Sequence, residues 1–207
     1  MNSIWQCPDG ADAVVVLAHG AGAGMGHRNM QSIADALERC GIGTLRFNFP
    51  FIDAGRKRVD SKEVAVATIV EAYGEARRRT DLPVWAGGHS FGGRMTTHAA
   101  AEGKLDPAGL VLYSFPLHAA GKPGVDRAAH LERIGLPMLF VSGTRDALAE
   151  RALLEPLVRS LPRAELHLLD TADHGYRTRR SERESDEDVF DELARATRRF
   201  VDRIQRG

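Results

Sequence analysis

The sequence predicts an α/β protein: a doubly wound, mostly parallel sheet of about six to seven strands, with helices on both faces. Short apolar runs alternate with longer amphipathic segments along the whole chain, which is typical of repeated β–α units. The first run, residues 13–18, reads AVVVLA and is apolar at every position, as expected for a parallel strand buried on both faces. No internal repeat or linker divides the chain, so we expect residues 1–207 to form one domain.

The elements follow one another in a regular order. After 13–18, we expect strands near residues 43–47, 84–87, 110–113, 138–141 and 165–169. Helices are expected near residues 29–40, 61–79, 92–101, 126–134, 148–160 and 186–205. In such a fold the carboxyl ends of the parallel strands share one edge, and open α/β sheets bind their ligands at that edge.

Composition excludes several classes of protein. Lys+Arg and Asp+Glu balance at 28 each, so the net charge favours neither nucleic acid nor an anionic membrane as a partner. The start, MNSIWQCPDG, lacks the features of a signal peptide, and no apolar run is long enough to span a membrane. Cys7 and Cys40 form no metal-ligand pattern. We expect a cytoplasmic protein without a metal site, and the oligomeric state stays open.

A glycine cluster, HGAGAGMG at residues 19–26, follows the first strand. A dinucleotide site would need GxGxxG, but Met25 and His27 stand where the third glycine is required. We therefore expect no nucleotide cofactor. Two interpretations remain for the cluster alone: a tight strand-to-helix turn, or a loop whose backbone N–H groups stabilise a developing negative charge.

Ser90 lies in the sequence GHSFG, which matches the G-x-S-x-G pattern. The pattern alone is weak, but an apolar strand precedes it and a helix pattern follows it. A serine in such a sharp turn takes a strained backbone, and glycines two residues to either side avoid collisions. The turn also presents Ser90 at a helix N-terminus, which favours an oxyanion. We expect Ser90 to be a nucleophile, with the N–H groups of Phe91 and Ala21 as oxyanion donors.

A nucleophilic serine needs a base and an acid that orients the base. Asp146 and His174 each follow the end of a predicted strand, in the chain order Ser, Asp, His. Asp170 is a minor alternative for the acid. Asp173 adjoins His174 and is poorly placed to reach its Nδ1 atom.

Basic residues also fall near these positions. Arg94 lies one turn after Ser90, and Arg179 and Arg180 follow His174. If they share the carboxyl edge of the sheet with Ser90, their guanidinium groups favour substrates that carry a carboxylate or phosphate. The competing interpretation is that they pair with Glu182, Glu184 and Asp186 and only solvate the loop.

Four segments together resemble the α/β-hydrolase superfamily. VVVLAHGAGAG, GGHSFGG, SGTRDA and TADHGY are similar to its oxyanion, nucleophile, acid and base segments, in that order. Within it the chain resembles small dienelactone-hydrolase-like serine hydrolases. RFNFPF, YSFPLH and GKPG are most similar to the branch named after a testis-expressed protein and a subunit of a nonspecific-lethal chromatin complex. The resemblance implies Ser90, Asp146 and His174 as a catalytic triad.

The family match leaves the substrate open. Dienelactone hydrolase itself uses a cysteine nucleophile, so the serine here does not imply that substrate. The connection between the predicted strands 110–113 and 138–141 is too short for a lid domain, so we expect an open site. The main expectation is hydrolysis of a small-molecule ester or thioester through an acyl-enzyme. The alternatives are a binding or scaffold protein with the same fold and, less favoured, a nucleotide-dependent oxidoreductase.

Overall fold

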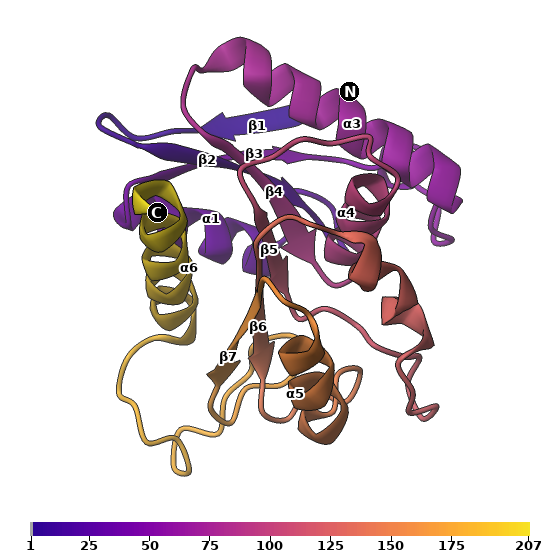
Figure 1. Ribbon diagram of the computed structural model, residues 1–207, viewed down its shortest axis with the longest axis vertical. Helices are drawn as coiled ribbons and strands as arrows, with labels where there is room; N and C mark the ends of the chain where they lie inside the picture. Colours follow the sequence, from indigo (N-terminus) through magenta and orange to yellow (C-terminus); the bar gives the residue numbers. More distant parts are fainter. Residues whose placement is uncertain (1) are drawn as a thin grey trace.

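A computed structural model describes residues 2–207 and contains one seven-stranded sheet (Figure 1). The strand order is β1-β3-β2-β4-β5-β6-β7. β1 pairs antiparallel with β3, and every other neighbouring pair is parallel. The predicted sheet of six to seven mostly parallel strands is confirmed. The strands are β1 Ser3–Gln6, β2 Ala13–Ala18, β3 Ile42–Phe47, β4 Val84–His89, β5 Leu110–Tyr113, β6 Met138–Gly143 and β7 Ala164–Leu169.

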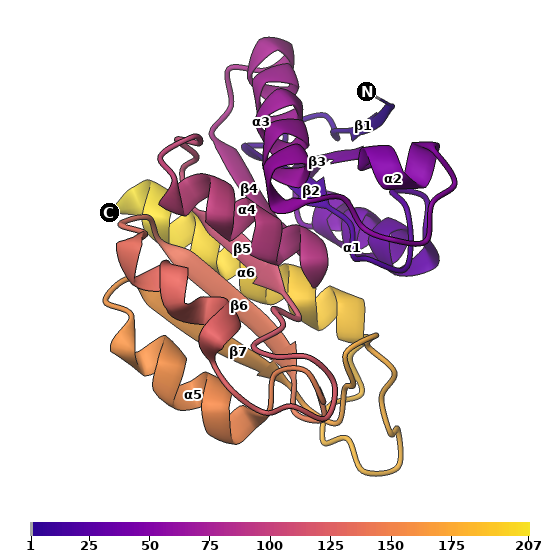
Figure 2. The ribbon, with the colours of Figure 1, turned by 90° about the vertical axis from the view of Figure 1, so that its right-hand side faces the viewer.

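Helices cover both faces of the sheet (Figures 1 and 2). α1 and α6 pack together on one face, and α3, α4, α5 and the 3₁₀ helix η1 pack on the other. The predicted doubly wound architecture is therefore confirmed. The helices are α1 Arg28–Arg39, α2 Pro50–Asp53, α3 Lys62–Arg79, α4 Phe91–Ala101, η1 Asp126–Arg133, α5 Arg151–Ser160 and α6 Val189–Arg206.

The apolar run of β2 is buried at all six positions because it serves both layers of the core. Successive side chains of a strand point to opposite faces of the sheet. Val16 and Ala18 pack into the layer under α3 and α4, whereas Val15 and Leu17 pack into the layer under α1 and α6. This central strand ends next to β4, and the site is built where these two strands end.

Several boundaries differ from the sequence expectations for local reasons. α5 begins at Arg151 and not near 148, because Asp146 turns the chain and accepts the Leu148 N–H at 2.8 Å. α6 begins at Val189 because Asp188 caps it by accepting the Phe190 N–H at 2.9 Å. The segment expected as a helix at 126–134 is the 3₁₀ helix η1. β1 and α2 were not predicted.

The connection between β5 and β6 carries η1 and loops, and no lid domain (Figure 2). The expectation of a lidless fold is confirmed. No helix within residues 2–207 is long and apolar enough to cross a membrane.

Candidate active site

Ser90 stands in the turn that joins β4 to α4. Its backbone has φ 52° and ψ −115°, a strained conformation for a residue with a side chain. The Ser90 N–H donates to the Tyr113 carbonyl of the neighbouring strand at 2.9 Å. The strand before and the helix after hold the strained residue in place, so that its hydroxyl reaches the cleft at the carboxyl edge of the sheet.

Two glycines allow this turn to pack against the end of β2. A Cβ atom added at Gly88 would lie 2.3 Å from the Ala18 carbonyl oxygen, and one at Gly92 would lie 2.4 Å from the same atom. Side chains do not fit at such distances. The glycines two residues before and after Ser90 are therefore required by close backbone approach.

Ser90, His174 and Asp146 form a continuous hydrogen-bonded chain. His174 Nδ1 lies 2.9 and 2.8 Å from the two carboxylate oxygens of Asp146. Because a carboxylate accepts, Nδ1 carries the proton, and Nε2 is left to accept from the Ser90 hydroxyl at 2.9 Å. Asp146 is buried, with 3% of its surface exposed. This arrangement lets His174 remove the Ser90 proton while Asp146 stabilises the resulting imidazolium.

Backbone contacts join the loop that carries Asp146 to the loop that carries His174. The Thr171 N–H donates to Thr144 Oγ1 at 2.8 Å, and the Arg145 N–H donates to the Ala172 carbonyl at 2.9 Å. A Cβ atom at Gly143 would lie 2.1 Å from that same carbonyl oxygen. These loops follow the neighbouring strands β6 and β7, so the sheet itself sets the distance between acid and base.

The two alternative acids hold their own loops. Asp173 Oδ1 accepts the N–H groups of Gly175 at 2.8 Å and Arg177 at 2.9 Å. Asp170 Oδ2 accepts the Glu184 N–H at 3.3 Å. Neither carboxylate is hydrogen-bonded to the His174 ring, whereas Asp146 is.

A cleft of about 350 Å³ opens at Ser90, and the glycine loop after β2 forms one wall. Ala21 lines it, and Phe91 begins α4 beside Ser90. Within residues 2–207, the backbone N–H groups of Ala21 and Phe91 donate no hydrogen bond, so both are free to bind an oxyanion. Across the same described part of the chain, no group of three or more His, Cys, Asp or Glu side chains is arranged to hold a metal ion.

His19 holds the glycine loop in place through hydrogen bonds of both of its ring nitrogens. Its Nδ1–H donates to the Gly20 carbonyl at 2.8 Å, and its Nε2 accepts the Phe49 N–H at 3.1 Å. These partners require the neutral ring, and burial lowers the pKa of His19 accordingly.

Two further residues hold the His174 loop. His89 Nε2–H donates to the His174 carbonyl at 3.1 Å, and burial lowers the pKa of His89 to about 4, so the ring is neutral near pH 7. From α1, Asn29 Nδ2 donates to the Gly175 carbonyl at 3.0 Å. The G-x-S-x-G pattern points to His89 by position alone, and no local signal points to Asn29, which lies 146 residues from its partner.

The three arginines expected at the rim are spread over the structure. Arg179 pairs with Glu182 at 3.1 Å. Arg180 lines a separate hollow together with Asp186 and Glu187. Arg94 is partly buried on α4, and burial, with the charge of Arg127, lowers its pKa. None of the three is among the residues that line the cleft of Ser90.

A second hollow, of about 700 Å³, adjoins that cleft. The two share His27, Asn29 and His174. Three exposed arginines line the second hollow: Arg28, Arg145 and Arg177. None of these arginines forms an ion pair within residues 2–207, and the hollow contains the single carboxylate of Asp173.

A family model for the alpha/beta hydrolase domain matches residues 11–202. The chain belongs to the α/β-hydrolase domain family. Similar solved structures include Est1E from Butyrivibrio proteoclasticus with bound ferulic acid, at 15% identity and a TM-score of 0.76, over 100% of this chain and 96% of that one. Dienelactone hydrolase from Anabaena variabilis is 20% identical, with a TM-score of 0.74, over 97% and 90% of the two chains.

A third similar structure, XC6422 from Xanthomonas campestris, is described as a serine hydrolase without a lid. It is 19% identical to this α/β hydrolase, with a TM-score of 0.68, over 97% of this chain and 88% of that one. At these identities the likeness establishes the fold alone, because one fold can carry many unrelated functions.

Proposed function

We propose that this α/β hydrolase cleaves a carboxylic ester or thioester through an acyl-enzyme on Ser90. The observation that carries the proposal is the hydrogen-bonded chain from Ser90 Oγ through His174 to the buried Asp146. A serine hydroxyl is a weak nucleophile until a base removes its proton, and a base held in one tautomer by a carboxylate does this efficiently.

The first half of the reaction forms the acyl-enzyme. His174 Nε2 takes the Ser90 proton as Oγ attacks the substrate carbonyl carbon and forms a new C–O bond. The carbonyl oxygen becomes an oxyanion and accepts hydrogen bonds from the N–H groups of Phe91 and Ala21. When the tetrahedral intermediate collapses, the bond to the alcohol or thiol breaks, and His174 gives its proton to that leaving group.

The second half releases the acyl group. Water enters the open cleft, gives a proton to His174 and attacks the acyl carbon. Collapse of this second intermediate breaks the bond to Ser90 Oγ, which recovers its proton from His174, and a carboxylic acid leaves. The N-terminus of α4, with its free N–H groups and positive dipole end, stabilises the negative charge in both halves.

The substrate class follows from the shape and charge of the site. An open, lidless cleft of about 350 Å³ offers little apolar wall for a long chain, so we expect short or compact acyl groups. We also expect a preference for anionic substrates, because arginines lie near the site. The sequence suggests Arg94, Arg179 and Arg180 for this role. The adjoining hollow offers Arg28, Arg145 and Arg177 instead. Similar folds belong to a dienelactone hydrolase and a monoacylglycerol lipase, so ester cleavage fits this architecture.

The alternative is a binding or scaffold protein that keeps the fold and has lost catalysis. The intact hydrogen bonds of Ser90 favour the enzyme. The narrower assignment to the branch of the testis-expressed protein and the nonspecific-lethal complex subunit rests on RFNFPF, YSFPLH and GKPG and stays a prediction.

The test begins with a fluorophosphonate probe. We expect intact-mass analysis to give one adduct and peptide mapping to locate it on Ser90, with none on the Ser90→Ala variant. The same pair of proteins is then compared on a panel of acyl esters and thioesters of increasing chain length. An adduct elsewhere refutes the assignment of Ser90. A folded wild-type protein that takes up no probe and cleaves nothing in the panel supports the scaffold alternative.

A further inference from the structure

The sheet ends at β7, which pairs only with β6. The Met138 N–H donates to the Arg163 carbonyl at 2.9 Å, and the Thr144 N–H donates to the Leu169 carbonyl at 3.0 Å. The odd-numbered residues of β7 therefore turn their backbone groups toward β6. Because the direction alternates along a strand, the N–H and C=O groups of Leu166 and Leu168 point to the open edge. Within residues 2–207 these groups have no partner.

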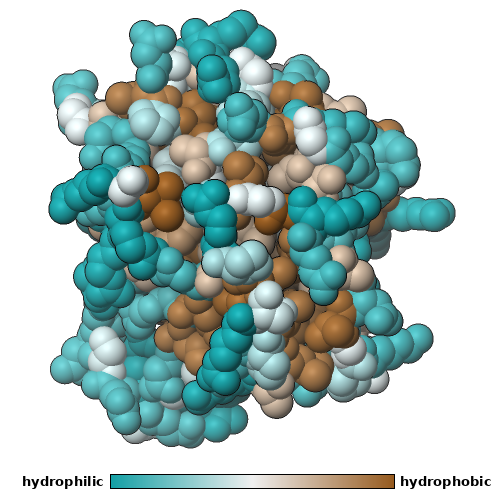
Figure 3. All heavy atoms as spheres, viewed as in Figure 1, coloured by the Kyte–Doolittle hydropathy of each residue, from teal (hydrophilic) through white to brown (hydrophobic). Residues whose placement is uncertain are grey.

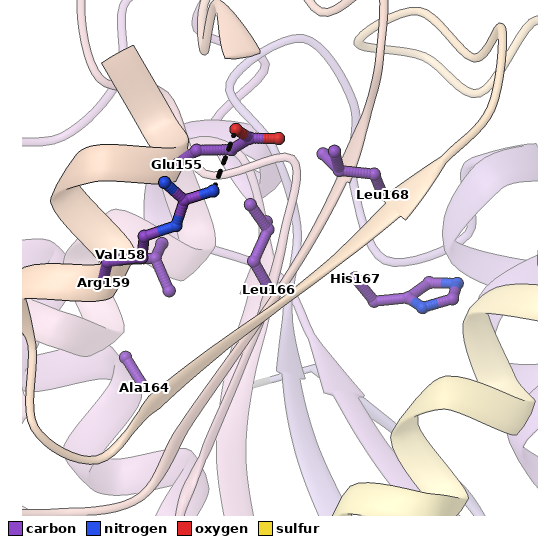
Figure 4. Close-up of a pocket in the computed structure, with 7 residues that line it drawn as sticks. All are labelled: Glu155, Val158, Arg159, Ala164, Leu166, His167 and Leu168. Atoms are coloured by element: carbon purple, nitrogen blue, oxygen red, sulfur yellow. Dashed lines mark hydrogen bonds and ion pairs between the residues drawn. The ribbon is translucent and has the colours of Figure 1, made fainter. Parts of the chain in front are cut away.

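The side chains at the same positions are apolar and incompletely covered. Ala164, Leu166 and Leu168 face α5 and, with Val158, line a hollow of about 420 Å³ (Figure 4). All three β7 residues are only partly buried. In the space-filling view, hydrophobic atoms gather over the region that β6, β7 and α5 occupy in Figure 1 (Figure 3). Apolar side chains that gather in this way at a surface can take part in an interaction site.

β7 also lacks most of the features by which proteins protect an edge strand. Its sequence, AELHLL, contains no proline, lysine or glycine, and its pairing with β6 runs through all six residues without a bulge. The opposite edge, β1, is only four residues long. An edge strand whose backbone groups are unpaired is a template for pairing with another strand.

The other face of β7 indicates which strand fits. Glu165 and His167 lie on this face, partly exposed, and each has a partner in its own chain: Glu165 pairs with Arg203, and His167 Nε2 lies 2.9 Å from Glu192. When two copies of β7 pair antiparallel with Leu166 at the centre, Glu165 of each copy lies opposite His167 of the other. The same register puts Leu166 opposite Leu166 and Ala164 opposite Leu168.

We propose that two copies of this chain associate through β7, antiparallel and with Leu166 on the two-fold axis, so that the two sheets continue into one another. The N–H and C=O groups of Leu166 and Leu168 and the carbonyl of Ala164 then form the hydrogen bonds between the copies, while the Ala164 N–H keeps its bond to the Leu161 carbonyl. The side chains of Ala164, Leu166 and Leu168 lie over the hollows beside α5, which Glu155 and Arg159 also line. This register also keeps the two Glu165 carboxylates from lying directly opposite each other, and like charges in that position destabilise a strand pair.

The first test measures the oligomeric state by sedimentation velocity over a range of protein concentrations. We expect a wild-type dimer and a Leu166→Lys monomer, because the two lysines would face each other in the seam. The matched control is Val64→Lys, an equally drastic change at a residue of α3 that is 43% exposed, which leaves the dimer intact. Thermal unfolding confirms that each variant is folded.

A second test checks the register without a charged substitution. In a background with Cys7→Ser and Cys40→Ser, the Leu166→Cys variant should form an interchain disulfide on mild oxidation, since opposite Cα atoms in a hydrogen-bonded pair are about 5.5 Å apart. Leu168→Cys should not, because each copy faces Ala164 of the other.

Three results would overturn the proposal. A wild-type protein that is monomeric at every concentration rejects the dimer and favours an extended segment of another protein as the occupant of the edge. A dimer that survives Leu166→Lys uses another surface. Crosslinking of His167→Cys in preference to Leu166→Cys rejects the register.

Discussion

The carboxylate of Asp146 contacts His174 Nδ1 with both oxygens, at 2.9 and 2.8 Å, although the residues are 28 positions apart in the chain. Asp146 Oδ1 also accepts the Leu148 N–H at 2.8 Å, which helps to hold the carboxylate in position. The neighbouring strands β6 and β7 bring the two loops together. The distance between acid and base is therefore a consequence of strand order.

Replacing Asp146 with Asn should lower kcat by about 10⁴-fold, because an amide no longer holds the His174 tautomer that accepts from Ser90. Asp170→Asn is the matched control and should keep near-normal turnover, since Asp170 holds only its own loop. Steady-state kinetics on one ester, with Ser90→Ala as the baseline, measures both. The opposite pattern would make Asp170 the acid.

Gly92→Ala should destabilise the protein and reduce fluorophosphonate labelling. The added methyl group would lie 2.4 Å from the Ala18 carbonyl oxygen, and relieving such overpacking typically costs about 1–3 kcal/mol. Urea unfolding measures the loss. Gly135→Ala is the control, because nothing lies within 4 Å of a Cβ there. Equal stability of the two variants would show that the turn tolerates a side chain.

The preference for an anionic over a neutral ester should fall when the hollow beside His174 loses its charge. We expect the double variant Arg145→Ala/Arg177→Ala to reduce the ratio of the two kcat/KM values by about tenfold. This is the upper range for charge contacts that are exposed and screened by solvent. Added salt should reduce the ratio further. Arg179→Ala/Arg180→Ala is the comparison. If only the second pair lowers the ratio, the rim suggested by the sequence is the one that acts. Arg94→Ala tests the remaining rim residue.

Acid should destabilise the packing of α4 against η1. His130 Nε2–H donates to Thr97 Oγ1 at 2.8 Å, and its ring stacks on His98. Burial first, then the nearby positive charges, lower the pKa of His130 to about 4, whereas the unfolded chain has a pKa of about 6.5. The unfolded state therefore binds more protons between these values, and stability is lost as the pH falls from about 6.5 through about 4.

The measurement is the free energy of unfolding in urea across that pH range. His130→Gln retains a donor for Thr97 without a titrating group, so its stability should depend less steeply on pH than that of the wild type. Part of the slope should remain, because burial also lowers the pKa of His89 to about 4. An unchanged slope would remove His130 from this explanation.

Local patterns in the sequence were sufficient to predict the six parallel strands, the helices on both faces and the absence of a lid, but not β1 or α2. A continuous apolar run such as AVVVLA indicates a strand that is buried on both faces. The signal is contained in a few consecutive residues, because neighbouring residues of a strand face opposite layers. The glycines around Ser90 are visible in the sequence as part of the G-x-S-x-G pattern, but Gly88 and Gly92 are required because the Ala18 carbonyl of β2 lies so close to them. The chain order Ser, Asp, His indicated which residues are candidates for the triad, but it contains no information on the distances between them.

Only the tertiary structure decided the contacts that depend on distant parts of the chain. Asn29 of α1 donates to the Gly175 carbonyl, and Arg28 lines the same hollow as Arg145 and Arg177. No periodicity or spacing in the sequence predicts either arrangement. The open edge of β7 is likewise a property of strand order, because AELHLL would read the same in the middle of a sheet. Sequence patterns report how each residue is buried, whereas the partners of a side chain are set by which elements the fold brings side by side.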